Sequence, residues 1–564
     1  MVALKIIIAE KGTTLRNLAY NQNVDLNKLR IHNPHLSHPD ADISGQKVKV
    51  PSSPKQVILK KTRQITNDNE EIVPTYEDCP PSPEIDYSDH WFPLTSLEEM
   101  EETNYDVIIV GSGAGGGSSL WRLAEQWRNQ GKRIAVLERG DLIIPTHVAN
   151  LPTAKTAGRF LQNPAFNVQK ETEWPEFPGA KQLFGLGGQT LRWGTVSPRF
   201  HPSDFKEWPI TFDDLIEYYN IAERVMNVTT EFTKGSNLQE TLLKRLREGG
   251  YHDATNLPRA IDLSSSYYGH IHSNVFFSSL EFMAWALNWN GVDFAVNANV
   301  VKLLHENNKV TGIKVMTPDR KSYTIHGKNV VVSGSTFETP RLLLHSNIPG
   351  EAIGKYLISH SFVTSRCLVS REEFGEVLGL ANIQIPSTEK RPYQISVQGP
   401  FPYEFYSYET KPFMKELDIG FWGFGIVEPN RDNRVVLERD NVDWYGVPKL
   451  NVHFSYSEQD LSIIQQMVND MFHAINTLEL TIETSPCLLP PGSDYHAAGT
   501  CRMGNNPATS VTNEYGQVHG MSNLFVADNS ILPFMGGANP TLTTIAVAMR
   551  TADYIVEKGI KNKS

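Results

Sequence analysis

Three glycines spaced for nucleotide binding lie between an apolar run and a helical pattern. Gly111, Gly113 and Gly116 form a GxGxxG motif directly after the β-branched run "DVIIV". The first glycine permits a tight turn, the second lets the backbone approach a pyrophosphate, and the third lets the helix pack against the strand. Because the first N–H groups of the helix face the negative charge, the motif predicts a dinucleotide site.

The elements around this turn have the order that such a site needs. A second apolar run, "RIAVLE", ends in Glu138, and a carboxylate about 20 residues after the motif hydrogen-bonds ribose hydroxyls. Together with the glycine motif, this pattern predicts that an adenine dinucleotide binds, but it does not distinguish NAD from FAD. From Tyr105 onward, apolar runs alternate with helical patterns, which predicts an α/β fold.

Size and composition limit the class of protein. The chain has 564 residues, which predicts two to four domains, and 40% of them are hydrophobic, which excludes a disordered or fibrous protein. The formal net charge of -11, without a run of five Lys or Arg, argues against nucleic acid or an anionic membrane surface as partner. The four scattered cysteines lack zinc-ligand spacing, so neither a disulfide framework nor a metal site is expected.

The start of the chain, "MVALKIIIAEKGTTL", has an apolar run too short for a signal peptide. No stretch approaches the roughly 20 apolar residues of a membrane span. We therefore expect no membrane span and a cytoplasmic location, with export by a route that needs no such signal as the alternative.

The first fifty residues have the pattern of a separate unit. Strand "KIIIAE" precedes a helix capped by Thr13, a second helix capped by Asp25 and the strand "KVKVP". The stretches "KGTTLRNLA", "NPHL" and "ISGQKVKVP" resemble a LysM domain, a family that usually has Asp where Thr13 stands. The resemblance implies contact with N-acetylglucosamine polymers such as peptidoglycan, and docking to a protein is the alternative. Residues 53–103, rich in Pro, Asp, Glu, Asn and Ser, predict a linker that Trp91 and Phe92 anchor locally.

Four further stretches together resemble the glucose-methanol-choline (GMC) oxidoreductases, which are FAD enzymes. They are "FGLGGQTLRWG" (184–194), "VVVSGSTFETPRLLLHS" (330–346), "YHAAGTCRMG" (495–504) and "NLFVADNSILPFMGGANPTLTTIAVAMRTADYI" (523–555). The resemblance implies a Rossmann-like FAD-binding domain and an α+β substrate domain whose sheet lies over the flavin. The expected boundaries are 104–205, 280–356 and 488–564 for the FAD-binding domain, 206–279 and 357–487 for the substrate domain, and 1–52 for a LysM-like βααβ domain.

The same stretches contain further candidates for FAD binding. At Gly187 and Gly188 the backbone can lie against a flat ring, because no Cβ intervenes. Asp528 follows the apolar run "NLFVA", where the resemblance places a segment beside the FAD diphosphate and ribityl chain. Pro540 sits at the first turn of a helix. The positive end of that helix, which includes Thr541, would stabilise negative charge on a reduced flavin.

One position departs from the sugar-oxidising members that bind FAD covalently. Those enzymes use a histidine in a Ser-Thr-His-Trp stretch, and the matching residues here are Thr190, Leu191, Arg192 and Trp193. Since arginine cannot form that bond, we expect FAD to be held without a covalent link. Arg192 is then either an ordinary salt-bridged residue or a contact of flavin or substrate.

Oxidation of an alcohol by hydride transfer requires a base within hydrogen-bond reach of the hydroxyl, and histidine suits neutral pH. The resemblance implies that His496, in "YHAAGTCRMG", is this base and that Asn539, in "GGANPT", is its partner. Asn539 can donate a hydrogen bond to the substrate oxygen. His360 and His519 are assigned to turns or packing.

The segment 433–461 resembles the sugar-oxidising branch, including pyranose oxidases. Sugar C–H faces stack on aromatic rings, and the candidates are Tyr403, Phe405, Tyr406, Tyr408, Trp422 and Phe424. The leading hypothesis is FAD-dependent oxidation of a sugar or glycoside at C2 or C3, with hydride transfer to flavin N5 and with oxygen or a redox carrier as electron acceptor. The alternatives are a GMC enzyme for a non-sugar alcohol and a glycan-anchoring or assembly protein whose oxidoreductase domain is secondary.

Overall fold

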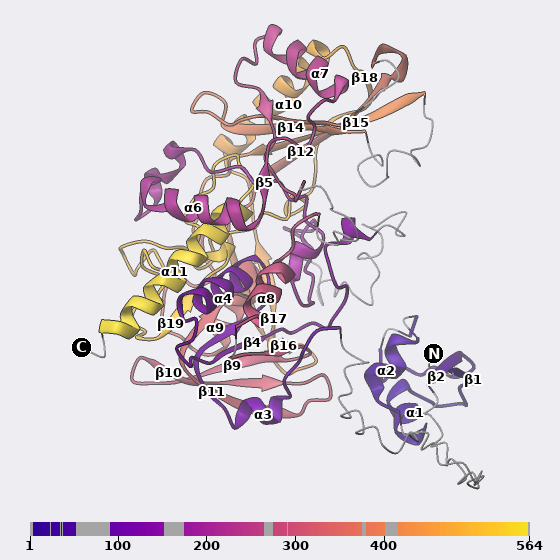
Figure 1. Cartoon of the computed structure of the whole chain (residues 1–564), viewed down its shortest axis with the longest axis vertical. Coiled ribbons are helices and arrows are strands. Elements are labelled where there is room, and N and C mark those ends of the chain that lie inside the picture. The colour runs from indigo at the N-terminus through magenta and orange to yellow at the C-terminus, as the bar shows by residue number, and fades with distance from the viewer. Residues whose placement is uncertain are drawn as a thin grey trace, which may run out of the picture. The chain divides into compact units, whose positions relative to one another are not determined.

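The computed structural model describes residues 4–22, 24–33, 35–36, 38–51, 91–151, 174–263, 275–289, 291–374, 379–400 and 415–561. The chain divides near residue 90 into two compact units, whose helices and strands are labelled in Figure 1. None of the helices within these ranges has the length and apolar character needed to cross a bilayer. The three cysteines in these ranges are free, and Cys79 lies outside them.

The smaller unit has the predicted order of strand, helix, helix, strand. β1 (Leu4–Ile8) pairs antiparallel with β2 (Lys47–Pro51), and α1 (Leu15–Gln22) and α2 (Leu26–Ile31) come between them in the chain. Its core is aliphatic and is made by Ala9, Leu15, Leu18, Ala19, Leu29, Leu36, Ile43, Val48 and Val50.

One of the two predicted helix caps in this unit is confirmed and the other is wrong. Asp25 accepts a hydrogen bond from the Lys28 amide at 2.9 Å. The first helix is capped by Thr14, whose hydroxyl accepts from the Asn17 amide at 3.2 Å. Thr13 lies one residue earlier, in a turn where its carbonyl accepts from the Ile43 amide at 2.8 Å.

The larger unit contains a seven-stranded sheet with parallel strands at its centre. Its order is β8-β4-β3-β11-β10-β9, and β19 also pairs with β11. The parallel strands are β3 (Asn104–Val110), β4 (Ile134–Leu137), β8 (Val292–Ala295), β11 (Ser322–Val332) and β19 (Leu524–Val526), and the antiparallel extension is β10 (Lys309–Met316) with β9 (Asn299–Glu306). This sheet confirms the predicted α/β class with a Rossmann-like arrangement.

Three helices that carry or support the site pack beside one another (Figure 1). α4 (Ala114–Gln126) follows the glycine turn, and α8 (Ser279–Leu287) and α11 (Thr541–Lys561) both contact it. The helix α9 (Ser335–His345) follows β11, and α6 (Asp213–Val225) contacts α11.

A second, antiparallel sheet has the order β18-β12-β15-β14-β13-β6. Its strands are β6 (Thr255–Asn256), β12 (Ser361–Ser370), β13 (Ala381–Ile385), β14 (Tyr393–Gly399), β15 (Glu416–Gly425) and β18 (Thr481–Leu488). Two helices, α7 (Asn237–Glu248) and α10 (Glu458–Thr477), share its apolar core. These strands fall in the segments predicted for the substrate domain, and the domain boundaries themselves stay a prediction.

Short elements complete the larger unit. The hairpin β16 (Arg434–Val442) with β17 (Pro448–His453) contacts α9, and β5 (Val228–Thr229) pairs with β7 (Arg259–Ala260). Of the predicted linker, only residues 91–103 are described. They include α3 (Leu97–Glu101), and Phe92 meets Phe294 edge-on with ring centroids 4.9 Å apart, so this part is anchored to the larger unit.

Candidate active site

A cavity of about 530 Å³ brings the predicted cofactor residues and the predicted catalytic residues together. Its lining includes Gly111, Gly113 and Glu138, and also His496 and Asn539. Gly188, Asp528 and Thr541 line it as well, whereas Gly116, Gly187 and Pro540 do not.

The first glycine turn has the geometry that each glycine was expected to permit. Gly111 has a φ of +97°, and a Cβ there would lie 2.3 Å from the Ser333 carbonyl oxygen. A Cβ on Gly116 would lie 2.0 Å from the Gly111 oxygen, so this position lets α4 pack closely. A Cβ on Gly113 would meet nothing within 4 Å. The backbone at Gly113 thus borders open space, which fits a pyrophosphate held at the start of α4.

Glu138 stands at the end of β4 and also fixes the glycine turn. Its carboxylate accepts hydrogen bonds from the Ser112 hydroxyl at 2.5 Å, the Ser112 amide at 3.2 Å and the Gly140 amide at 2.8 Å. Burial raises the pKa of this carboxyl above its ordinary value. The remaining lone pairs of the carboxylate are suited to ribose hydroxyls.

The second glycine turn packs against the first. Gly187 has a φ of +101°, and its amide donates to the Ser112 hydroxyl at 3.0 Å. A Cβ on Gly188 would lie 3.1 Å from the Cα of Gly113. The two turns therefore form one continuous glycine cradle, which the Ser112 hydroxyl joins.

Asp528 holds two segments together at the cavity wall. Its carboxylate accepts from the Ser335 amide at 2.9 Å, the Thr339 hydroxyl at 2.5 Å and the Ser530 amide at 2.8 Å. Pro540 precedes α11 by one residue, because its carbonyl accepts from the Thr544 amide at 2.9 Å. The helix therefore begins at Thr541, one residue later than predicted.

His496 and Asn539 are in direct contact although they are 43 residues apart: the Asn539 Nδ2 atom lies 3.2 Å from the His496 Nε2 atom. The His496 side chain is 14% exposed. Burial, followed by the neighbouring His360, lowers the pKa of His496 well below its usual value. The imidazole is thus neutral at neutral pH and can accept a proton.

His360 is a part of this site that the sequence assigned to packing. Its Nδ1 atom lies 2.9 Å from Nδ1 of His496, and its Nε2 atom lies 2.7 Å from the Gly536 carbonyl oxygen. Asp494 lies beside the pair, with a carboxylate oxygen 3.9 Å from His496 Nδ1. Ligand atoms of His360, Asp494 and His496 lie within 4.8 Å of one another, a spacing that a metal could use. Hydrogen bonds within the protein already engage these ring nitrogens, which favours a purely hydrogen-bonded group.

One of the predicted sugar-stacking aromatic residues reaches the histidines. The Phe424 ring lies 5.0 Å from the His496 ring and 5.8 Å from the His360 ring, measured between centroids. Phe424 also stacks on Phe362, and neither Phe424 nor Trp422, which lie on the same strand, lines the cavity. The candidates Tyr403, Phe405, Tyr406 and Tyr408 lie outside the described residues.

Arg192 lines the cavity and forms no ion pair within the described residues. Its Nε donates to the Gln189 side-chain oxygen at 2.9 Å, and its guanidinium lies 5.3 Å from the centroid of the Tyr495 ring. The buried Nη2 atom has no hydrogen-bond partner among the described residues. Since an unpaired buried donor is costly, this environment favours the ligand-contact reading over the salt-bridge reading.

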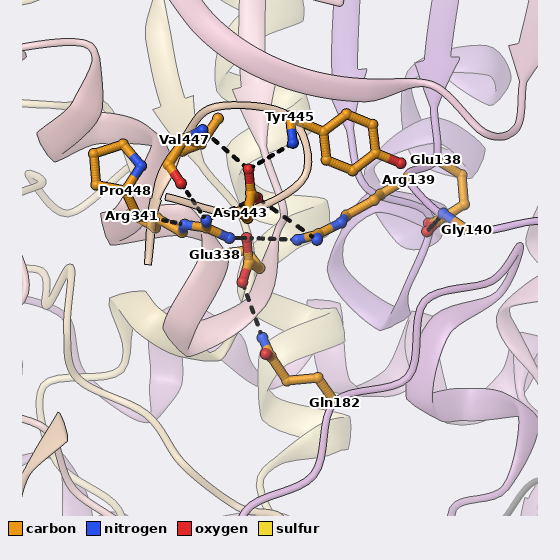
Figure 2. A network of polar contacts seen from close by, with 10 residues as sticks. All are labelled: Glu138, Arg139, Gly140, Gln182, Glu338, Arg341, Asp443, Tyr445, Val447 and Pro448. Carbon is orange, nitrogen blue, oxygen red and sulfur yellow. Dashed lines mark hydrogen bonds and ion pairs between the residues drawn. The ribbon is translucent and has the colours of Figure 1, made fainter. Parts of the chain in front are cut away.

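A charged network occupies another part of the lining, next to Glu138 (Figure 2). Glu338 accepts from Nη1 of Arg139 and from Nη1 of Arg341, each at 3.2 Å. Asp443 accepts from Nη2 of Arg341 at 2.8 Å. Figure 2 shows how these four side chains join the segment after β4, helix α9 and the loop between β16 and β17.

Comparison with known proteins identifies relatives for most of the chain. The GMC oxidoreductase family matches at residues 180–362 and 429–548. A 2-methyl-1,2-propanediol dehydrogenase of Mycolicibacterium austroafricanum is 25% identical over 80% of this chain and 95% of its own length. A C-glycoside 3-oxidase of Arthrobacter globiformis is 26% identical over 68% of this chain and 75% of its own. The structure of an Aspergillus oryzae formate oxidase variant has a TM-score of 0.60 at 15% identity, covers 81% of this chain and 98% of its own, and shows the shared fold.

Proposed function

The chain belongs to the GMC oxidoreductases, FAD enzymes that act on alcohol groups, and we propose that it oxidises a secondary alcohol of a sugar or glycoside at C2 or C3. The observation that carries this proposal is the contact between His496 and Asn539 in the same cavity as the glycine cradle. This contact supports the proposal that His496 is the base and Asn539 the amide donor to a substrate held beside a bound flavin.

In the proposed reaction, His496 Nε2 takes the hydroxyl proton of the substrate while the C–H bond breaks. Asn539 donates an amide hydrogen to the same oxygen, which holds the alcohol and stabilises the charge that develops on it. FAD, when bound, supplies N5 as the acceptor of the hydride. The alcohol thus loses one proton, which His496 holds, and one hydride from carbon, which together balance its oxidation to a ketone.

The proposal of a carbohydrate substrate rests on two supports. The first is the relative named as a C-glycoside 3-oxidase. The second is the resemblance of segment 433–461 to the sugar-oxidising branch. A non-sugar alcohol is the second candidate, because another relative is named as a 2-methyl-1,2-propanediol dehydrogenase. The electron acceptor is oxygen or a redox carrier.

We further propose that FAD is bound without a covalent link, because arginine occupies position 192. Acid precipitation of the holoenzyme should leave all flavin in the supernatant. Yellow colour retained in the washed pellet would contradict this.

For the small unit we propose contact with a glycan, which would raise the local concentration of substrate without a new active-site contact. The support is its LysM-like sequence and its βααβ order. The full chain and a chain that begins at residue 90 should be sedimented with peptidoglycan. Only the full chain should co-sediment, and equal sedimentation of both would remove the glycan role.

The test of the main proposal is anaerobic reduction of the bound flavin by a panel of monosaccharides, glycosides, 2-methyl-1,2-propanediol and simple alcohols. Bleaching should be fastest with a pyranose or pyranoside, and the product should carry a ketone at C2 or C3. Preference for 2-methyl-1,2-propanediol or a simple alcohol would replace the sugar proposal by the second candidate.

A further inference from the structure

We propose that a one-directional chain of five hydrogen bonds, from Gln384 to the Gly536 carbonyl, fixes the tautomer of His496 so that Nε2 carries the lone pair. In this account His360 and Gln394 are positioning residues that act through the base and its partner. The inference rests on the assignment of His496 as base made above.

The Gly536 end of the chain sets its direction. A carbonyl oxygen can only accept, so the His360 Nε2 atom, 2.7 Å away, must carry a hydrogen. His360 is 1% exposed, and burial lowers its pKa to about 4, so the ring is neutral and its Nδ1 atom holds a lone pair. That lone pair faces Nδ1 of His496 at 2.9 Å, which must therefore be the N–H of the His496 ring. The Nε2 atom of His496 is left as the basic nitrogen.

The glutamine end gives the same direction independently. Gln384 donates through Nε2 to the Gln394 side-chain oxygen at 2.7 Å, so the amide nitrogen of Gln394 faces Asn539. Gln394 then donates to the Asn539 Oδ1 atom at 3.0 Å. This turns the Asn539 amide nitrogen toward Nε2 of His496, which is the arrangement that an unprotonated Nε2 requires.

If the five hydrogen bonds ran in the opposite direction, His496 could not accept the substrate proton at Nε2. This reversal would put a hydrogen on Nε2 of His496 and would bring the lone pair of His360 Nε2 against the Gly536 carbonyl. Buried acceptors that face each other are unfavourable. In the observed direction, the proton taken up at Nε2 creates an imidazolium whose Nδ1–H is already held by His360, with the Asp494 carboxylate 3.9 Å away.

The first test uses the pH dependence of variants at position 394. Gln394→Glu can donate to Asn539 only when its carboxyl is protonated, so the rate of anaerobic flavin reduction relative to the parent should rise at least fivefold as the pH is lowered from 8 to 6. Gln394→Leu has no donor at any pH and should show a lower rate with no such rise. Gln398→Leu is the matched control, because Gln398 lies on the same face of β14 but takes no part in this chain of hydrogen bonds. A pH-independent ratio for Gln394→Glu, or a parental rate for Gln394→Leu, would overturn the proposal.

The second test uses His360. The amide of His360→Gln can accept from His496 and donate to Gly536, whereas His360→Leu can do neither. We expect flavin reduction at saturating substrate to fall at least tenfold in the leucine variant and to recover partly in the glutamine variant. Equal rates for the two variants would contradict the proposal that the hydrogen bonds of His360 fix the tautomer of His496. The substrate in both tests is the alcohol that reduces the parent flavin fastest, so failure of every alcohol would refute the proposed function instead.

Neutron diffraction from the substrate-free holoenzyme in D₂O reads the tautomer directly and needs no substrate. Deuterium should appear on Nδ1 of His496 and on Nε2 of His360. Deuterium on Nε2 of His496 would refute the proposed direction, even if either variant fails to fold.

Discussion

Two polar networks line the same cavity and are built on opposite principles. The network beside Glu138 consists of four charged side chains, with Arg139 and Arg341 against Glu338 and Asp443 (Figure 2). The network at His496 consists of amides and neutral imidazoles joined in one direction. The first ties segments of the fold together, and we propose that the second presents a base with a defined lone pair.

The difference follows from what each network must do. Opposite charges that are buried together offset the cost of removing each other from water, but loss of one partner leaves an uncompensated buried charge. Burial by itself would raise the pKa of Glu338, yet Arg341 and Arg139 lower it, and the balance lies below its ordinary value. At His496, burial first and the neighbouring His360 second lower the pKa of the ring well below its usual value. We therefore infer that the charged network stabilises the fold and that the neutral network serves the proposed reaction.

The largest expected effect on stability is in the charged network. Arg341→Met would remove the closest cationic partner of the fully buried Asp443 side chain and one of the two arginines that pair with Glu338. Loss of one member of a buried pair costs about 3–5 kcal/mol. Urea unfolding of the holoenzyme, followed by tryptophan fluorescence, should show this loss. The control Arg431→Met breaks an exposed pair and should cost less than about 1 kcal/mol; equal losses would contradict the contrast.

The largest expected effect on rate is in the neutral network. Asn539→Ala removes one donor to the reacting oxygen, and loss of such a donor lowers the rate by about 10² to 10³. Flavin reduction under anaerobic rapid mixing is the measurement. The unfolding midpoint should change less than in Arg341→Met. If Asn539→Ala lowered the unfolding midpoint strongly but kept the parental rate of flavin reduction, the roles assigned to the two networks would be wrong.

A smaller effect is expected on the pH dependence of stability, to which the neutral network contributes through His360. The pKa of His360 is lowered by burial to about 4, whereas an unfolded histidine titrates near about 6.5. Between these two pKa values the unfolded chain binds a proton at His360 that the folded protein does not bind. The contribution of neutral His360 to the free energy of unfolding is therefore present above about pH 6.5 and is lost as the pH falls toward 4. We expect a loss of about 2 kcal/mol between pH 7 and pH 5. His360→Gln should lose less over this interval, and an identical pH dependence would argue against a buried neutral His360.

The parts of the site that sequence could predict are those fixed by local geometry. The GxGxxG turn and Glu138 lie close along the chain, and the helix α4 and strand β4 between them set their separation. The contact of His360 with His496 joins residues 136 positions apart and depends on how β12 meets the C-terminal segment, so no local pattern foretells it. The charged network is equally non-local, since Arg341 and Asp443 are 102 positions apart. The choice between Thr13 and Thr14 as helix cap failed for a related reason, because the distant Ile43 amide engages Thr13.

The central claim is that His496 is the base for alcohol oxidation. The most direct test compares anaerobic flavin reduction in the parent and in His496→Ala, each loaded with FAD and mixed with the best alcohol of the panel. We expect a rate at least 10² lower in the variant, with an unchanged flavin content. A variant that reduces its flavin as fast as the parent would show that another group takes the proton.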